Sequence, residues 1–185
     1  MSESISWIRS MTGPIGLDHS PNRSGALEQR VTAVYLQSRG EIYRYVTAIG
    51  LDSATAQEVT QEAFLRLHAA LCDRHTIRCD RAWLFTVAHN LALNTKARML
   101  TLDELDPDLH SSPADGPERL LVTGERLKRV REAVESLSPQ QRQCLELRAE
   151  GFRYREIAEI LGLATSTVGE FLRRAMQQLR KAAPG

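Results

Sequence analysis

The sequence of 185 residues has few aromatic side chains, only 5%, and no long uninterrupted apolar run. No stretch approaches the roughly 18 apolar residues of a membrane span, and the N-terminal residues lack the apolar block of a signal peptide. We therefore expect no membrane insertion, a cytoplasmic location and reduced thiols. An alternating apolar pattern typical of strands is also missing, so the composition favours an all-α fold of one or two small domains with thin cores.

The sequence also lacks the residues that catalysis requires. No nucleophile, base and orienting residue occur together, and there is no glycine-rich phosphate loop, so we expect no enzymatic activity and no cofactor. One alternative is a zinc site or redox pair, because His68, Cys72, His75 and Cys79 recur at intervals of four, three and four. A small nucleic-acid hydrolase would need metal there. Since a loop is expected in this segment and would break the helical spacing, we predict no metal.

The clearest positive signal lies near the C-terminus. Ser138 and Gln141 form a capping box that begins a helix. A second amphipathic helix is expected over residues 154–161, and Gly162 is placed to end it. A third helix follows over about residues 165–181. Two helices joined by a glycine-containing turn predict a helix-turn-helix, whose second helix is available to enter a major groove.

One face of this last helix is predicted to read DNA, because its polar residues recur at spacings of three and four. The residues that we assign to this reading face are Ser166, Gly169, Glu170, Arg173, Arg174 and Gln177. From residue 138 to residue 185, basic residues exceed acidic residues by three, which is the sign that phosphate contacts require. A helical bundle with solvated arginines is the plainer alternative.

Another helix is expected earlier in the chain, over residues 81–98, and its composition is unusual because it contains no acidic residue. Its apolar residues form a buried side, and polar residues four apart form a stripe beside it. This melting stripe is Thr86, Asn90, Asn94 and Arg98. Amides, cations and neighbouring aromatic rings are suited to holding unpaired bases and their phosphates. Ordinary surface asparagines are the alternative.

These signals divide the chain into a flexible tail, a first helical domain, an acidic linker and a helix-turn-helix domain. The corresponding ranges are 1–26, 27–99, 100–116 and 117–185. Two or more helices are expected in the first domain before Gly50 interrupts the pattern. From residue 99 to residue 125, acidic residues exceed basic residues by six, so charge in this chain is a local property.

The arrangement resembles the extracytoplasmic-function group of bacterial RNA polymerase sigma factors, within the sigma-70 family. The likeness covers about residues 27–181. Residues 56–67 are similar to the family's helix that binds core polymerase, residues 82–92 to its promoter-melting helix, and residues 137–168 to its reader of the minus-35 box. Separate matches that follow in the right order make this resemblance specific.

The resemblance implies an alternative sigma factor that binds the clamp and flap surfaces of core RNA polymerase, recognises minus-35 and minus-10 promoter elements, and opens the DNA. Polymerase contacts would come from Glu58, Gln61, Glu62 and Arg66. The melting stripe would line the path of the single strand, and the loop from Cys72 to Asp80 would capture a base swung out of the stack. The acidic linker would thread toward the active-site cleft. An anti-sigma partner is a further expectation.

Some residues depart from the family pattern. Glu58 and Asn94 stand where members often have Asp, and Gly169 and Phe171 stand where members often have basic residues. Glu170 repels phosphate but is able to accept a hydrogen bond from cytosine N4. The remaining alternative is an autonomous regulator that binds duplex DNA as a dimer, and it leaves the melting stripe unexplained.

Overall fold

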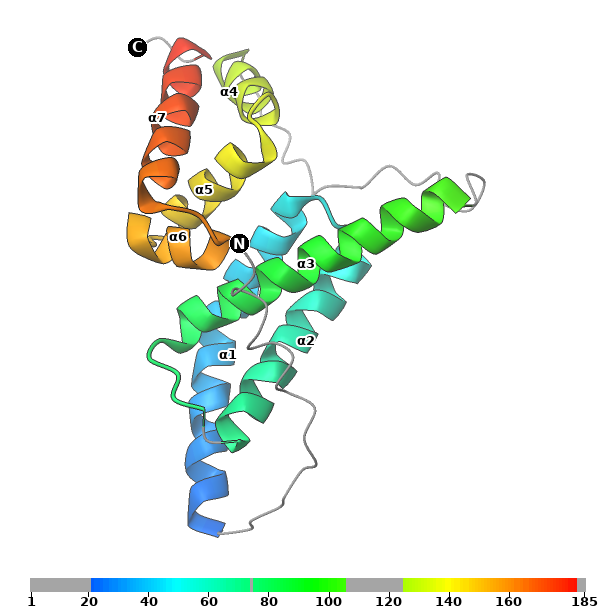
Figure 1. The fold of residues 1–185 in the computed structure, drawn as a ribbon, viewed down its shortest axis with the longest axis vertical. Helices are drawn as coiled ribbons and strands as arrows, with labels where there is room; N and C mark the ends of the chain where they lie inside the picture. The colour runs from blue at the N-terminus through cyan, green and yellow to red at the C-terminus, as the bar shows by residue number, and fades with distance from the viewer. Residues whose placement is uncertain (1–20, 74, 106–124, 183–185) are drawn as a thin grey trace.

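The computed structural model describes residues 21–73, 75–105 and 125–182. Within these ranges the chain forms only α-helices, as Figure 1 shows. Their bounds are α1 Pro21–Ile49, α2 Ser53–Cys72, α3 Asp80–Leu105, α4 Glu125–Glu135, α5 Pro139–Ala149, α6 Tyr154–Leu161 and α7 Thr165–Ala182. The predicted all-α fold is therefore confirmed. No helix of the described ranges is long and apolar enough to span a bilayer.

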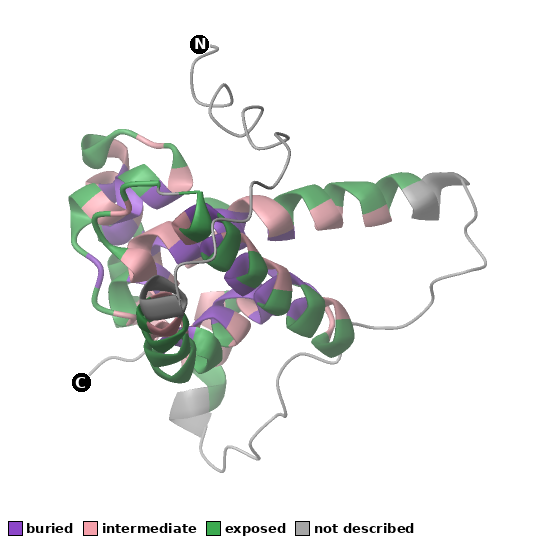
Figure 2. Ribbon diagram, turned by 90° about the horizontal axis from the view of Figure 1, so that it is seen from below, coloured by how far each residue is buried: buried purple, intermediate pink, exposed green. Residues whose placement is uncertain are grey.

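The first domain consists of α1, α2 and α3, which pack against one another. Fully buried side chains such as Tyr45, Leu67 and Leu84 fill the space between them. Figure 2 shows the buried residues concentrated where the helices meet, with exposed residues on the outer faces. The C-terminal part of α3 extends beyond its neighbours (Figure 1).

The junction between α1 and α2 depends on Gly50. Its φ of +106° is a left-handed conformation that residues with a side chain rarely adopt. A Cβ atom there would also lie 2.9 Å from Lys96 Nζ, which donates a 2.8 Å hydrogen bond to the carbonyl of Ile49. The N-cap of α2 is Asp52, whose carboxylate accepts from the backbone N–H groups of Ala54 and Thr55. These contacts tie α1, α2 and α3 together at one end.

The second domain consists of α4 to α7, and its local signals were read correctly from the sequence. The capping box of Ser138 and Gln141 is present, and α6 ends at Gly162 with a φ of 65°. From α7, Val168 and Leu172 are buried in the core. The helix-turn-helix predicted from this punctuation is thus formed.

Three expectations about the helices of the first domain were wrong. Instead of two or more helices before Gly50, the chain forms the single helix α1, because Gly40 costs a helix interior only about 1 kcal/mol and no proline interrupts it. Helix α1 also begins at Pro21, inside the expected tail. Helix α3 continues to Leu105, inside the expected linker. The rest of that linker, and the start of the domain expected from residue 117, lie outside the described residues.

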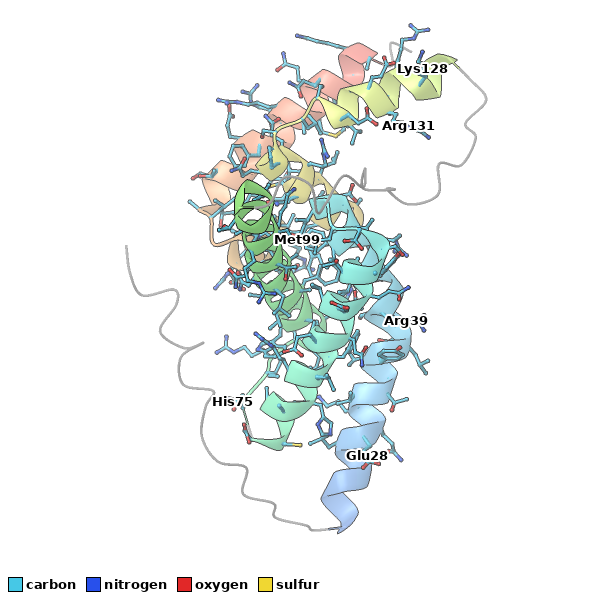
Figure 3. All side chains as sticks on the ribbon, turned by 90° about the vertical axis from the view of Figure 1, so that its right-hand side faces the viewer. Glu28, Arg39, His75, Met99, Lys128 and Arg131 are labelled. Carbon is cyan, nitrogen blue, oxygen red and sulfur yellow. The ribbon has the colours of Figure 1, made fainter. Side chains whose placement is uncertain are left out.

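The two domains touch each other and share one continuous apolar core. Helix α1 packs against α5, and α3 packs against α6. Figure 3 shows the resulting elongated arrangement, with Lys128 of α4 and His75 of the loop between α2 and α3 toward opposite ends of the molecule. The thin separate cores expected from the sequence are therefore joined at this contact.

Candidate nucleic-acid interface

Helix α7 presents an exposed polar face, as predicted for the second helix of a helix-turn-helix. Ser166, Arg173, Arg174 and Gln177 are exposed. The apolar residues of α7 face α4, α5 and α6, against which the helix packs. Because only one side of α7 is covered, the polar side is free to approach a duplex.

Glu170 binds the two neighbouring arginines of this face. Arg173 donates hydrogen bonds of 2.8 and 3.0 Å to the two carboxylate oxygens, and Arg174 donates one of 2.7 Å. These hydrogen bonds, that from Arg173 foremost, lower the pKa of the Glu170 carboxyl to about 2. The carboxylate is therefore ionised and already paired, so its repulsion of phosphate is offset within the helix.

Gly169, like Glu170, is half-buried, and it has no side chain to offer to DNA. A Cβ atom at this position would lie 3.8 Å from Cε2 of Tyr154 on α6. Tyr154 is itself 45% exposed, and the Arg148 guanidinium carbon lies 5.9 Å from the centre of its ring. Sequence reasoning missed Tyr154 at this surface, although an aromatic residue at the start of α6 was a usable signal.

The C-terminal end of α7 carries further positive charge that the sequence reading did not assign. A shallow, open hollow is lined there by Arg173, Gln177, Arg180 and Lys181. All four residues follow the i, i+3 or i+4 spacing of the reading face, so the pattern that identified Arg173 could have been extended by two turns. This extension gives α7 a continuous basic edge.

The melting stripe on α3 becomes more exposed toward the C-terminal end of the helix. Thr86 and Asn90 are half-buried, whereas Asn94 and Arg98 are exposed. The hydroxyl of Thr86 donates a 3.0 Å hydrogen bond to the carbonyl of Ala82 in its own helix, so it is partly satisfied already. The predicted residues lie on one helix face, and Asn94 and Arg98 are its most accessible members.

A buried polar pair joins α1 to α3. The hydroxyl of Tyr45 and Nδ1 of His89 are 2.9 Å apart, and both residues are buried. Burial lowers the pKa of His89 to about 4 and raises the pKa of Tyr45, so both side chains are neutral at pH 7. This pair fixes the rotation of α3 relative to α1 and hence the direction of the melting stripe.

The loop before α3 is anchored by a residue that the sequence did not indicate. Arg30 of α1 donates hydrogen bonds of 2.8 and 2.7 Å to the two carboxylate oxygens of Asp80. A longer contact of 3.5 Å reaches the carbonyl of Ile77. Ile77 and Asp80 lie 47 and 50 residues from Arg30 along the chain, so no local pattern could have connected them. This bidentate ion pair between Arg30 and Asp80 restrains the loop where it joins α3.

The histidines and cysteines of this region do not gather into a metal site. His68 Nδ1 and Cys72 Sγ are 3.8 Å apart, but no group of three or more metal-ligating side chains occurs among the described residues. Cys72 and Cys79 are exposed free thiols. Cys144 is buried as expected, and burial raises the pKa of its thiol to about 11.

The predicted polymerase-binding residues lie on α2. Glu58 and Gln61 are exposed, whereas Glu62 and Arg66 are half-buried and joined by an ion pair of 2.8 Å. Beside them, an open groove between α1 and α2 holds residues that the sequence reading had not assigned. These groove residues include Tyr35, Gln57, Gln61, Phe64 and Leu65. Leu65 is 57% exposed, so this surface combines charge with accessible apolar area.

Models of known protein families match both domains. Residues 34–99 match Sigma-70 region 2, and residues 127–179 match Sigma-70, region 4. RNA polymerase sigma factor YlaC of Bacillus subtilis is 29% identical over 153 residues, covering 80% of this chain and 88% of its own. ECF RNA polymerase sigma factor SigK of Mycobacterium tuberculosis is 27% identical over 186 residues, covering 92% of this chain and 97% of its own.

Solved structures share the fold. The sigma factor RpoE in complex with the anti-sigma factor NepR, from Bartonella quintana, has a TM-score of 0.63 at 23% identity and covers 82% of this chain and 94% of its own. CnrH in complex with the cytosolic domain of CnrY has a TM-score of 0.58 at 21% identity, covering 86% and 92%. These structures support the fold. The two family models, in the order that the sequence predicted, and the sigma-factor relatives show that the chain belongs to the extracytoplasmic-function group of the sigma-70 family of RNA polymerase sigma factors.

Proposed function

We propose that this alternative sigma factor binds core RNA polymerase through α2, reads the minus-35 element with α7, and opens the minus-10 element with α3. One observation carries this proposal: two separate helices with exposed polar faces, α3 and α7, lie in domains that match sigma regions 2 and 4. An autonomous dimeric regulator would use α7 alone, so it gives no reason for the polar stripe on α3.

The polymerase contact is proposed for the surface around Glu58, Gln61, Glu62 and Arg66. The exposed side chains of Leu65 and Tyr35 next to them support this assignment, because protein interfaces combine an apolar centre with a polar rim. The ion pair of Arg66 with Glu62 is half-exposed and local to α2, so a partner is able to exchange it for intermolecular contacts at little cost.

For promoter melting, we propose that the single strand follows the stripe from Thr86 to Arg98. Amide groups of Asn90 and Asn94 offer donors and acceptors to base edges, and Arg98 offers a cation to a phosphate. The loop that ends at Asp80 would receive an extruded base, which requires a restrained pocket. The bidentate ion pair between Arg30 and Asp80 supports this role because it holds the loop in place before the base arrives.

For minus-35 recognition, we propose that α7 enters the major groove with Ser166, Arg173 and Arg174 toward the DNA. Arginine pairs with guanine or with phosphate, and Glu170 is able to accept from cytosine N4. Since Glu170 holds both arginines in the free protein, reading requires an exchange of this internal pairing for contacts with the duplex. Gly169 would contribute close approach rather than a side-chain contact.

The chemistry of RNA synthesis belongs to the polymerase, since sigma factors are initiation factors without catalytic activity. We propose that the same holds for this chain, that it acts in the cytoplasm beside the polymerase, and that an anti-sigma protein restrains it. The acidic linker, which lies outside the described residues beyond Leu105, is proposed to thread toward the polymerase cleft, where negative charge imitates nucleic acid.

Run-off transcription tests the proposal. Purified core RNA polymerase is supplied with promoter fragments from the source genome, with and without this protein. We expect specific transcripts only when the protein is present, and we expect an Asn90→Ala/Arg98→Ala variant to lose them while still co-eluting with core polymerase. Failure of the unchanged protein to co-elute with core, or to give any transcript, would refute the assignment.

A further inference from the structure

The loop that precedes α3, residues 75–79, is held at both ends by backbone hydrogen bonds. At its start, the N–H of His75 donates a 3.0 Å hydrogen bond to the carbonyl of Ala70 in α2. At its end, the carbonyl of Cys79 accepts a 3.0 Å hydrogen bond from the N–H of Trp83 in α3. Within the described part of the chain, residues 76–78 make no backbone-to-backbone hydrogen bond. The middle of this loop therefore depends on side chains for its conformation.

Arg30 of α1 is the side chain that reaches the middle of the loop. Its guanidinium donates hydrogen bonds of 2.7 and 2.8 Å to the Asp80 carboxylate and lies 3.5 Å from the carbonyl of Ile77. The Ile77 side chain is half-buried and packs against the core, whereas its neighbours Thr76 and Arg78 are exposed. Arg30 thus bridges the loop and the first turn of α3, while the polar side chains on either side of Ile77 remain accessible.

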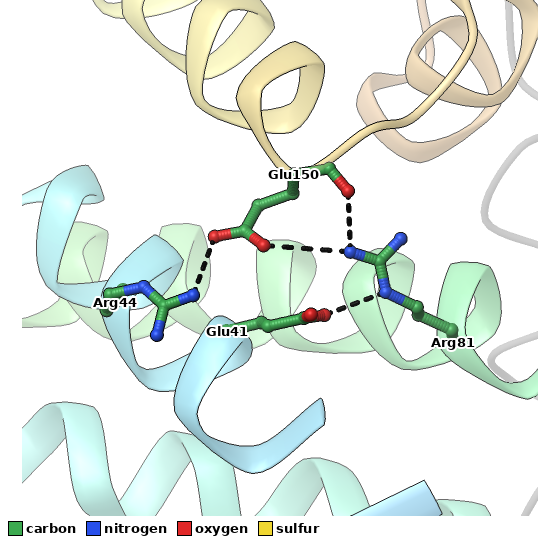
Figure 4. Close-up of polar contacts among 4 residues, drawn as sticks. All are labelled: Glu41, Arg44, Arg81 and Glu150. Atoms are coloured by element: carbon green, nitrogen blue, oxygen red, sulfur yellow. Dashed lines mark hydrogen bonds and ion pairs between the residues drawn. The ribbon is translucent and has the colours of Figure 1, made fainter. Parts of the chain in front are cut away.

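The residue after Asp80 forms a second ion pair with α1. Arg81 Nε donates a 2.7 Å hydrogen bond to Glu41, as Figure 4 shows. Arg81 Nη2 donates one of 2.8 Å to the backbone carbonyl of Glu150, and the guanidinium carbon lies 4.3 Å from the centre of the Phe152 ring. Among the described residues, none of these contacts of Arg81 reaches the loop. The two neighbouring ion pairs therefore join the same helices but differ in whether they restrain residues 76–78.

The exposure of the pair of Arg30 with Asp80 indicates that it adds little to the stability of the fold. The Arg30 side chain is 47% exposed and that of Asp80 is 14% exposed. Water screens an ion pair with an exposed partner, so such pairs contribute little to the free energy of unfolding. The planar guanidinium has donors in fixed directions, however, and a bidentate contact permits few arrangements of its partner. The effect of the pair is therefore on the conformation of the loop.

Arg30 also lies before residues 34–99, which match Sigma-70 region 2, so the restraint comes from a part of α1 outside the matched residues. We propose that Arg30 is a positioning residue for promoter opening. Through Asp80 and Ile77 it holds the loop in one conformation, ready to take an extruded base, without contacting the DNA itself. A loop that is ordered in advance loses less conformational entropy on binding, so affinity rises. The inference rests on the proposed function for its purpose, while the restraint is a property of the free chain.

The first test measures backbone order in the full free chain by nitrogen-15 relaxation. In the wild type we expect order parameters of about 0.85 for residues 76–78, the value of a rigid backbone. In Arg30→Ala we expect them to fall below about 0.6. A loop that stays rigid in Arg30→Ala, or one that is already mobile in the wild type, would overturn the inference.

A matched control is Glu41→Gln, which removes the charge of the neighbouring ion pair between α1 and α3. We expect its loop to stay as ordered as that of the wild type. We also expect Glu41→Gln and Arg30→Ala to lower the Tm by similar amounts, within about 4 °C, because both ion pairs are partly exposed. Equal loss of loop order in the two variants would indicate a general loosening of α3 and would overturn the specific role of Arg30.

The second test measures binding of DNA by the complex of this protein with core polymerase. The DNA is a promoter found in the run-off experiment, with its minus-10 region unpaired, and single bases of that region are removed one at a time. The captured base is the one whose removal weakens binding by the wild type most. We expect Arg30→Ala to bind the complete DNA on the order of tenfold more weakly than Glu41→Gln does, and both to bind DNA without the captured base equally. An equal deficit on both DNAs would contradict positioning.

Asp80→Ala separates positioning from a direct contact between Arg30 and a phosphate. If Arg30 acts through Asp80, this variant loses binding as Arg30→Ala does, and that is the result we expect. If Arg30 contacts phosphate, removal of its carboxylate partner strengthens binding instead, and the inference is overturned. Because the relaxation test needs neither polymerase nor promoter, a rigid wild-type loop in a protein that binds no promoter would count against the proposed function alone.

Discussion

Helices α3 and α7 carry the two stripes proposed to meet DNA, but they are covered in different ways. Helix α7 packs against α4, α5 and α6 with its apolar side only, and it is strongly amphipathic. Helix α3 packs against α1 and α2 on one side and against α6 on another, and its apolar residues are spread around its circumference. A helix that packs on one side only has an amphipathic sequence pattern, from which its exposed face can be predicted. A helix that packs on two sides lacks this pattern.

The largest expected effect concerns the packing of α3 against helices of both domains. Phe85 is fully buried and contacts both Tyr45 and Phe152. We expect Phe85→Ala to lower the free energy of unfolding by about 3–5 kcal/mol, because it removes a buried ring shared by both domains. Urea denaturation followed by circular dichroism measures this loss. The matched variant on α7 is Phe171→Ala, whose half-buried ring should cost only about 1–2 kcal/mol; equal losses would remove the contrast between the helices.

The second prediction uses the buried histidine of α3, since the buried residues of α7 are all apolar. Burial lowers the pKa of His89 to about 4, below its unfolded value of about 6.5. The native state therefore resists protonation, and the stability contributed by neutral His89 is complete above about pH 6.5 and is lost as the pH falls toward 4. The full loss is about 3 kcal/mol.

Urea denaturation at pH 7 and pH 5 checks this dependence, with His89→Gln as the control that keeps a hydrogen-bonding side chain but no longer titrates. We expect the wild type to lose about 2 kcal/mol more than the control between these pH values. Burial raises the pKa of Glu146, so this carboxyl acts in the opposite direction, but it acts equally in both proteins. Parallel pH profiles would mean that His89 is not shielded as described.

The third prediction separates the two helices by the form of DNA that they bind. In the complex with core polymerase, Arg173→Ala on α7 should weaken binding to duplex containing the minus-35 element by about 1–3 kcal/mol and leave single-stranded minus-10 DNA unaffected. Arg98→Ala on α3 should do the reverse. Fluorescence anisotropy with the two labelled DNAs measures both effects, and Arg155→Ala serves as a control at an exposed arginine of α6. If either variant lost binding to both DNAs, the proposed separation of roles between α3 and α7 would be contradicted.

The smallest expected effect concerns the glycine on the reading face of α7. A Cβ atom at Gly169 would make an ordinary contact of 3.8 Å with Tyr154. Gly169→Ala should therefore stabilise the protein by about 0.5–1 kcal/mol, because alanine loses less backbone entropy in a helix. Thermal denaturation should show a rise in Tm. Gly50→Ala is the opposite case, since its φ of +106° and the nearby Lys96 Nζ oppose a side chain, and it should lower the Tm.

The contrast between the helices also explains how much could be predicted from the sequence. The boundaries of the helix-turn-helix could be predicted because the residues that set them bond to groups three or four positions away. These residues are Ser138, Gln141 and Gly162. Phe152 and Arg81 act across about seventy positions of chain, and nothing near either residue reveals the partner. Two or more helices were expected before Gly50, whereas tertiary packing holds α1 continuous through Gly40, whose cost in a helix interior is only about 1 kcal/mol. The site residues on α2, α3 and α7 remain predictions for the experiments above.

The pairing of Glu170 with Arg173 and Arg174 changes what salt is expected to do to promoter binding. Arginines that approach DNA from water release the counterions that were condensed on the phosphates, and affinity then falls steeply as salt is added. Here the protein supplies its own anion to both cations before DNA arrives, and that anion stays covalently attached afterwards. Helix α7 thus carries an internal counterion, and the minus-35 contact should tolerate changes in cellular ionic strength better than its number of arginines suggests.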